Sequence, residues 1–183
     1  MSLFNKMLRA AKLDTSLYEE VEKDETATNQ AILVVVIASI CSGIGSAIGG
    51  MTSGVGGLVM GLVGGVVAAL VGWFIWSFIT YFIGTRLFKG PQTEASYGQL
   101  LRCIGFSNSP GVLGILAFIP IIGGIIALIA AIWSLIAMVI AVRQALDFST
   151  GRSIATCIVG FIVMMIIIAA IGMATGGLLA LKG

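Results

Sequence analysis

The chain has 183 residues, of which 58% are hydrophobic and only 10% are charged, and its formal net charge is +2. A soluble domain carries roughly a quarter charged residues, so a water-soluble fold of this length could not cover its own surface with polar groups. The composition therefore indicates a membrane protein, and the small, scattered positive charge excludes the basic stripe that nucleic-acid binding requires.

Residues 1–30 form a polar lead that we expect to lie in the cytoplasm. Apolar residues recur at helical spacing between Leu3 and Ala11, with Lys6, Arg9 and Lys12 on the remaining face. This pattern predicts a short basic amphipathic helix on the anionic inner leaflet, with a frayed polar tail as the alternative. The acidic residues that follow, from Glu19 on, leave no room for a secretory signal, so we expect the first apolar stretch to remain as an anchor.

Three stretches carry no charged residue, and they contain 60, 40 and 29 residues: Thr26–Thr85, Cys103–Val142 and Ser153–Leu181. A helix needs about 20 apolar residues to cross a bilayer, so these lengths accommodate two, two and one crossings. Because lipid cannot satisfy backbone N–H and C=O groups, the crossings should be helices. We predict an all-α, polytopic transmembrane bundle of about five spans over residues 31–183, with approximate spans Ala31–Ile48, Leu58–Ile83, Cys103–Pro120, Ile121–Val142 and Ile154–Ala174.

The distribution of basic residues predicts the orientation. With the N-terminus inside, nine of the ten Lys and Arg residues lie on the inner side and only Lys182 lies outside. The C-terminus is then outside, and the inner surface carries the charges of Arg86, Lys89, Arg102, Arg143, Asp147 and Arg152. Arg143 and Asp147 have the i, i+4 spacing of a weak local ion pair.

The third predicted span is interrupted by Ser107, Asn108, Ser109 and Pro110. Pro110 removes a backbone donor and disfavours helical geometry at Ser109, so the helix should kink or break near Pro110. These four residues are our candidate polar site or hinge, and a purely structural kink is the alternative. If this segment entered the membrane and returned, the fifth span would invert and eight basic residues instead of nine would lie inside.

The glycine-rich segment from Gly43 to Gly65 should let the outer ends of the first two spans pack closely within the chain, with a dimer face as the alternative. The three cysteines, Cys41, Cys103 and Cys157, fit small packing residues better than disulfides or ligands. The sequence contains no histidine and the apolar stretches contain no carboxylate, so we predict no catalytic set, no metal site and no cofactor. The same lack of charge argues against proton-coupled transport.

A succession of short motifs resembles the Yip domain family, which is named for proteins that interact with Ypt/Rab GTPases. The resemblance covers nearly the whole chain and is carried by Tyr18–Asp24, Ala27–Ala31, Ser42–Gly45, Leu100–Phe106 with Ser109–Pro110, Ile119–Pro120, Ile132–Trp133 and Ala141–Asp147, with Ala155 opening the last span. It implies a five-span helical domain with a cytoplasmic N-terminus. In eukaryotes such proteins act in secretory traffic, bind Rab GTPases and associate with one another.

This chain departs from the eukaryotic pattern, because the family's Asp-Leu-Tyr-Gly-Pro stretch has no counterpart before the first span. That departure argues against a Rab-type GTPase partner and favours a prokaryotic member in the cell inner membrane. Our leading hypothesis is a non-enzymatic protein that organises or scaffolds membrane components, in contact with the lipid bilayer and with itself or other membrane proteins. The alternatives are a small channel or carrier for an uncharged solute, and a lipid-handling protein.

Overall fold

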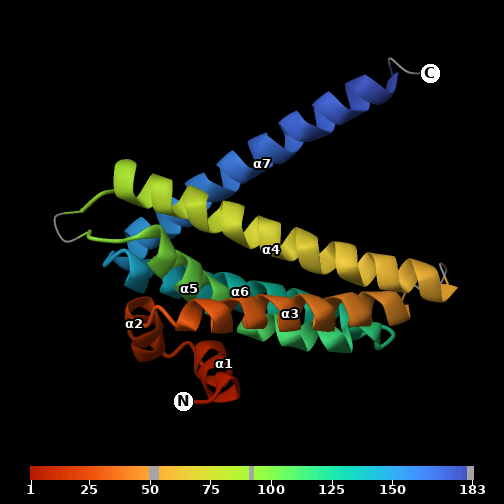
Figure 1. Cartoon of the computed structure of the whole chain (residues 1–183), viewed down its shortest axis with the longest axis horizontal. Helices are drawn as coiled ribbons and strands as arrows, with labels where there is room; N and C mark the ends of the chain where they lie inside the picture. The colour runs from red at the N-terminus through yellow and green to blue at the C-terminus, as the bar shows by residue number, and fades with distance from the viewer. Residues whose placement is uncertain (50–53, 91–92, 181–183) are drawn as a thin grey trace.

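The computed structural model describes residues 1–49, 54–90 and 93–180, and the regular structure in these residues is helical (Figure 1). Two short helices come first, α1 (Leu3–Ala11) and α2 (Thr15–Lys23). The long helices are α3 (Ala27–Gly49), α4 (Gly54–Arg86), α6 (Gly123–Ala145) and α7 (Thr150–Ala180). Between α4 and α6 lie α5 (Tyr97–Ser107) and a 3₁₀ helix, η1 (Ser109–Phe118).

Five helical segments are long and apolar enough to cross a membrane: Ala27–Ser46, Val59–Arg86, Tyr97–Phe118, Gly123–Ala145 and Thr150–Met173. They confirm the predicted all-α class and the five spans. Several helices run beyond the predicted ends; α6, for example, continues past Arg143 to Ala145. The prediction stopped at the first charged residue, whereas the backbone hydrogen bonds of a helix continue until the chain turns.

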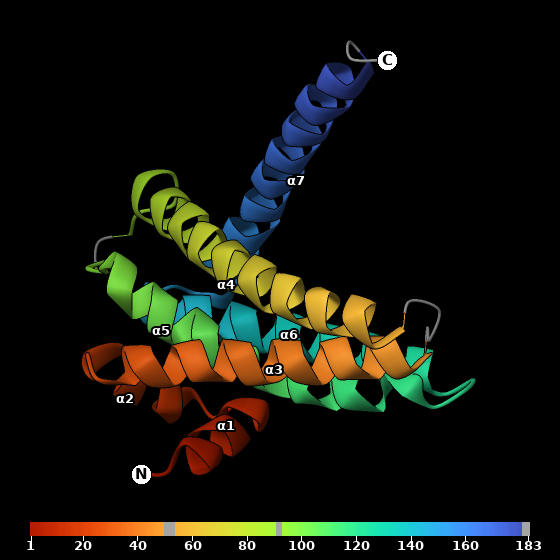
Figure 2. The same ribbon diagram turned by 45° about the vertical axis from the view of Figure 1, so that its right-hand side comes forward.

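The third span is bent where the prediction placed its break. It consists of α5 and η1, which meet at Asn108 and continue in the same direction along the bundle (Figure 1). The segment therefore passes through the bundle and does not turn back. It is also the most buried span, since 61% of the residues in an 18-residue stretch of it are buried, against 17–28% in the equivalent stretches of the other four. Helices α1, α2, α3, α4 and α6 pack against it (Figure 2).

Close backbone approaches explain how the third span fits at the centre. A Cβ atom built at Gly105 of α5 would lie 2.6 Å from Cβ of Ala31 in α3. At the other end, a side chain on Gly45 of α3 would collide with the carbonyl oxygen of Gly114 in η1. The end of α3 also approaches α4, as predicted for the first two spans, since a Cβ built at Gly43 would lie 2.8 Å from the Leu62 side chain. The close packing against the third span was not predicted. Glycines such as Gly61 in α4 have no neighbour within 4 Å of a built Cβ.

Helix α2 packs onto the bundle at the end where α5 begins, and α1 lies further along it, against α5, η1 and α6 (Figure 1). The hydroxyl of Ser2 caps α1 by accepting a hydrogen bond from the Asn5 N–H, and the carboxylate of Asp14 caps α2 through the Ser16 N–H. Leu17, Tyr18 and Val21 of α2 are fully buried in the same hydrophobic core as α5 and α6. Residues 1–23 are therefore a docked helix pair.

Helix α7 packs against the bundle only along its first half. Cys157 is buried, and a Cβ built at Gly160 would touch Trp76 of α4 at 3.4 Å. The second half of the helix diverges from α4 and α6 (Figures 1 and 2), and residues 165–173 are all exposed.

Candidate functional site

The bend in the third span is stabilised by its own polar side chains. Pro110 has no N–H with which to bond the carbonyl oxygen of Phe106, and the Ser109 hydroxyl donates to that oxygen instead, at 2.7 Å. The Ser107 hydroxyl and the Asn108 Nδ2 both donate to the carbonyl oxygen of Ile104, at 2.7 Å and 2.8 Å. These bonds satisfy the carbonyls that the break would otherwise leave unpaired, as the structural-kink alternative expects.

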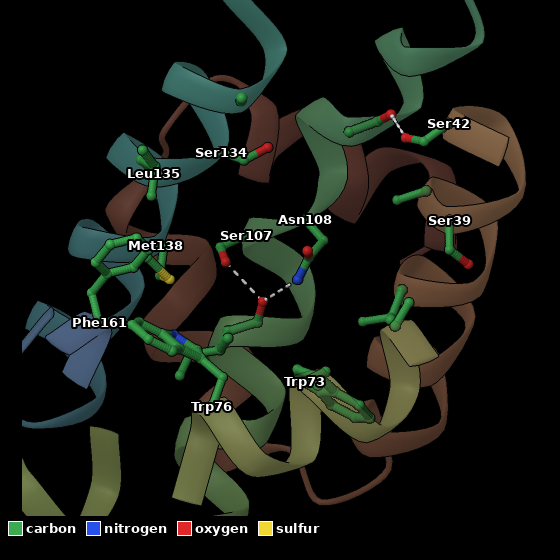
Figure 3. A pocket seen from close by; sticks show the side chains of 17 residues that line it. Ser39, Ser42, Trp73, Trp76, Ser107, Asn108, Ser134, Leu135, Met138 and Phe161 are labelled. Atoms are coloured by element: carbon green, nitrogen blue, oxygen red, sulfur yellow. Dashed lines mark hydrogen bonds between the residues drawn. The ribbon is translucent and has the colours of Figure 1, made fainter. Parts of the chain in front are cut away.

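A pocket of about 560 Å³ lies beside the bend (Figure 3). All 17 residues that line it are uncharged, and they come from α3, α4, α6, α7 and the third span. Of the four candidate residues, Ser107 and Asn108 line the pocket, whereas Ser109 and Pro110 are buried outside it. The bend therefore presents two of its polar residues to a cavity.

The pocket opens on the side of the molecule that the bilayer covers. Ala131 and Leu135 of α6 and Phe161 of α7 line it and are exposed. These residues belong to segments long and apolar enough to span the membrane. An opening between such segments faces lipid.

Several polar groups of the pocket already have hydrogen-bond partners, and others have none among the described residues. Ser39 donates to the Val36 carbonyl at 2.9 Å, and Ser42 donates to the Gly111 carbonyl at 3.2 Å. The indole N–H of Trp76 is buried and finds no acceptor among the described residues. Neither the Oδ1 atom of Asn108 nor the Ser134 hydroxyl forms a hydrogen bond with these residues, so the pocket offers both donors and acceptors to a ligand.

Sequence reasoning missed the contributions of the other spans. Ser39 and Ser42 lie three residues apart, a spacing that puts both hydroxyls on one face of α3, and this signal was readable. Ser134 and Trp76 carried no comparable pattern. The indole N–H of Trp73, unlike that of Trp76, is paired, because it donates to the Leu101 carbonyl at 3.1 Å.

A second cavity of about 190 Å³ adjoins the first. The two share Ser42, Gly111, Ala131 and Ser134, and the second continues along η1 to Gly114 and Ala117. Ser46 adds a further hydroxyl to its wall. A hydroxyl-bearing route thus leads from the bend toward the end of the bundle opposite α2.

Five of the six charges predicted for the inner surface are exposed: Arg86, Lys89, Arg143, Asp147 and Arg152. These five belong to helix ends or connections at the end of the bundle that holds α2, and the sixth, Arg102, belongs to α5 (Figure 1). The spacing of Arg143 and Asp147 does not produce an ion pair, because α6 ends at Ala145 and Asp147 adopts a left-handed backbone with φ of 51°. Arg143 instead reaches the Thr150 hydroxyl at 3.5 Å.

Arg102 is the exception, because it is 7% exposed. Its Nε donates to the Val21 carbonyl at 2.8 Å, and its Nη2 donates to the Glu22 carbonyl. These carbonyls belong to the last turn of α2, where a helix leaves acceptors unpaired. Arg102 is therefore the side chain that holds the end of α2 on the third span.

Residues 1–49, 54–90 and 93–180 contain no group of three His, Cys, Asp or Glu side chains able to hold a metal ion.

The chain matches a known family, because the model of the Yip1 domain matches residues 15–172. The chain belongs to the Yip1 domain family. This Yip1 domain protein matched no curated protein and no solved structure. The match covers all five spans, so the family and the multi-span architecture agree.

Proposed function

We propose that this Yip1 domain protein is a non-enzymatic organiser of membrane components, and that it binds the uncharged part of a membrane lipid in the pocket beside Asn108. The observation that carries the proposal is the pocket itself: about 560 Å³, lined by uncharged residues and open between spans. Its volume lies within the roughly 300–1,000 Å³ typical of small-molecule sites.

The polar groups of the pocket would determine what it selects. An apolar chain gains little from moving out of lipid tails into an apolar pocket, because both surroundings are hydrocarbon. The oxygen of a lipid ester, amide or hydroxyl could instead accept a hydrogen bond from the Trp76 indole N–H. A lipid hydroxyl or amide N–H could donate to the Oδ1 atom of Asn108. Leaving such groups unpaired costs about 1–3 kcal/mol each, so a ligand that pairs them is favoured over bulk acyl chains.

The proposal includes the orientation of the protein in the membrane. The charges of the connecting segments gather at the end that holds α2, and basic loops favour the cytoplasm. This distribution supports residues 1–30 as a cytoplasmic segment, the spans over residues 31–183, an outside C-terminus and, for a prokaryotic member, the cell inner membrane. The exposed second half of α7 is the surface best suited to a protein partner or a second copy.

Photo-cross-linking in native membranes tests the lipid proposal. A photoreactive side chain at Leu135, on the rim of the pocket, is expected to capture one lipid class above its share of the membrane. The matched control is Ile166, which is exposed on α7 away from the pocket and should capture lipids in bulk proportion. Asn108→Leu should abolish the enrichment at Leu135. Adducts at Leu135 that mirror those at Ile166 would refute the proposal.

A carrier for an uncharged solute is the second candidate, and the adjoining cavity of about 190 Å³ favours it, because it extends the hydroxyl-bearing route along η1. The opposite end is packed by Tyr18, Leu100 and Phe106, all fully buried, so transport would require that end to open. The test is solute flux in reconstituted vesicles. A carrier should raise the flux of some solute above the level of empty vesicles. If the unsubstituted protein and the variants Asn108→Leu and Pro110→Ala all leave every flux at that level, the carrier is excluded.

A further inference from the structure

The first helix leaves two of its large apolar side chains, Phe4 and Leu8, uncovered by the protein. Phe4 is 73% exposed and Leu8 is 44% exposed, and they lie four residues apart on one face of α1. The opposite face, with Ala10 and the side chain of Lys6, is buried against the bundle at 0% and 4% exposure. Leu3 and Met7 pack against the core. Phe4 and Leu8 therefore form a second apolar stripe, which a helix packed on a protein in water would not leave exposed.

The basic residues of α1 are engaged within the N-terminal segment. Lys6 Nζ lies 3.4 Å from the carboxylate of Asp24, and Arg9 contacts the carboxylates of Asp14 and Glu20, both at 2.7 Å. Residues 1–25 carry four basic side chains against six acidic ones. Anionic headgroups would therefore repel this segment as a whole, and attraction to them cannot explain why α1 would lie at a membrane.

Helix α1 lies beside the spans. The indole N–H of Trp133 donates to the carbonyl oxygen of Ala11 at 2.7 Å, at the C-terminal end of α1. Trp133 is near the middle of α6, about 18 Å from Ala145 at 1.5 Å per residue. Because the hydrocarbon core is about 30 Å thick, a helix held at this height cannot remain outside the headgroups.

Helix α1 contacts α6 beside an exposed apolar surface of α6. Ile129, Ile132 and Ile136 surround Trp133 at helical spacing, and each is about half exposed. Phe4 and Leu8 thus lie on a helix that contacts a span whose exposed surface is apolar. Together with the internal ion pairs, this position favours the acyl region of the bilayer as the partner of the face.

We propose that α1 is an apolar wedge inserted among the acyl chains of the leaflet on the N-terminal side, tethered to the spans by the bond from Trp133 to Ala11. Phe4 and Leu8 contact the lipid tails, while Lys6 and Arg9 are neutralised from within. The segment thereby enlarges the cross-section of the protein in one leaflet only. This inference does not depend on what the pocket binds.

Site-directed spin labels in vesicles test the wedge. Labels at Phe4→Cys and Leu8→Cys are introduced in a Cys41→Ala background, because Cys103 and Cys157 are buried. The control is Glu19→Cys on the exposed face of α2. In vesicles of zwitterionic lipid alone, the labels at positions 4 and 8 should be accessible to oxygen and protected from a water-soluble nickel chelate, with the reverse at position 19.

Three results would overturn the proposal. Access of the nickel chelate to position 4 equal to that at position 19 would place α1 in water. Protection that appears only with anionic lipid would show electrostatic attachment. Protection from oxygen and nickel alike would show that a protein covers the face. In addition, Trp133→Phe should raise the access of nickel to position 4 by roughly 2- to 10-fold, the effect of losing one hydrogen bond, and an unchanged value would exclude the tether.

Discussion

Arg102→Met is expected to release the N-terminal helix pair from the bundle. The substitution keeps an apolar stem at the site but leaves the carbonyls of Val21 and Glu22 without the guanidinium that binds them. Each unpaired acceptor costs about 1–3 kcal/mol, and removing the guanidinium recovers part of its own desolvation cost. We expect a net loss of about 2–4 kcal/mol, which corresponds to a roughly 30- to 1,000-fold larger undocked population.

Amide hydrogen exchange of α1 and α2 in nanodiscs measures this population directly, because the amides exchange when the pair undocks. The matched control is Arg143→Met, since Arg143 is exposed and donates a long hydrogen bond of 3.5 Å to the Thr150 hydroxyl. The control should shift exchange by less than about 0.5 kcal/mol. If Arg102→Met changes the exchange of α2 no more than the control does, Arg102 does not hold the helix and the reasoning is wrong.

Two further predictions concern packing and pH. Gly114→Val should destabilise the protein by about 1–3 kcal/mol in denaturant titration, because Ser42 Cα and Cβ lie 3.0 Å from a built Cβ, whereas Gly64→Ala, with open space around it, should cost nothing. Hydrogen bonds from Ser16 and Arg9 lower the pKa of Asp14 from 3.8 to about 2, so this carboxylate stabilises the α1–α2 pair above pH 4 and the contribution is lost as the pH falls toward 2. Burial raises the pKa of Glu22, which acts in the opposite sense, so stability falls as the pH rises through its titration. Asp14→Asn should reduce the dependence on pH, below pH 4, of the undocking free energy measured by hydrogen exchange. An unchanged dependence would show that Asp14 is not the group responsible.

The spans and the bend could be predicted from the sequence because each depends on local chemistry. The length of an uncharged run sets the number of crossings, and Pro110 alone removes the backbone bond that a straight helix would need. Half of the candidate site followed from the same reasoning, since Ser107 and Asn108 do line the pocket.

The arrangement of the spans could not be predicted, because the long helices are apolar on every side. Such a helix gives no indication of which face meets protein and which meets lipid. The central position of the third span, the pocket residues from α3 and α6, and the divergence of α7 all depend on that information. The role of Arg102 was hidden for another reason: its acceptors are backbone carbonyls 80 and 81 residues away, which have no signature in the sequence.

Because η1 is a 3₁₀ helix, the third span is longer than it would be if the same residues formed an α-helix. Ten residues advance about 20 Å as a 3₁₀ helix but only about 15 Å as an α-helix. Converting η1 to an α-helix would shorten the span by about the height of one α-helical turn without breaking its run of internal hydrogen bonds. The connection from Ile119 to Ile122 would then be drawn toward the bend, and the walls of both cavities would shift with it.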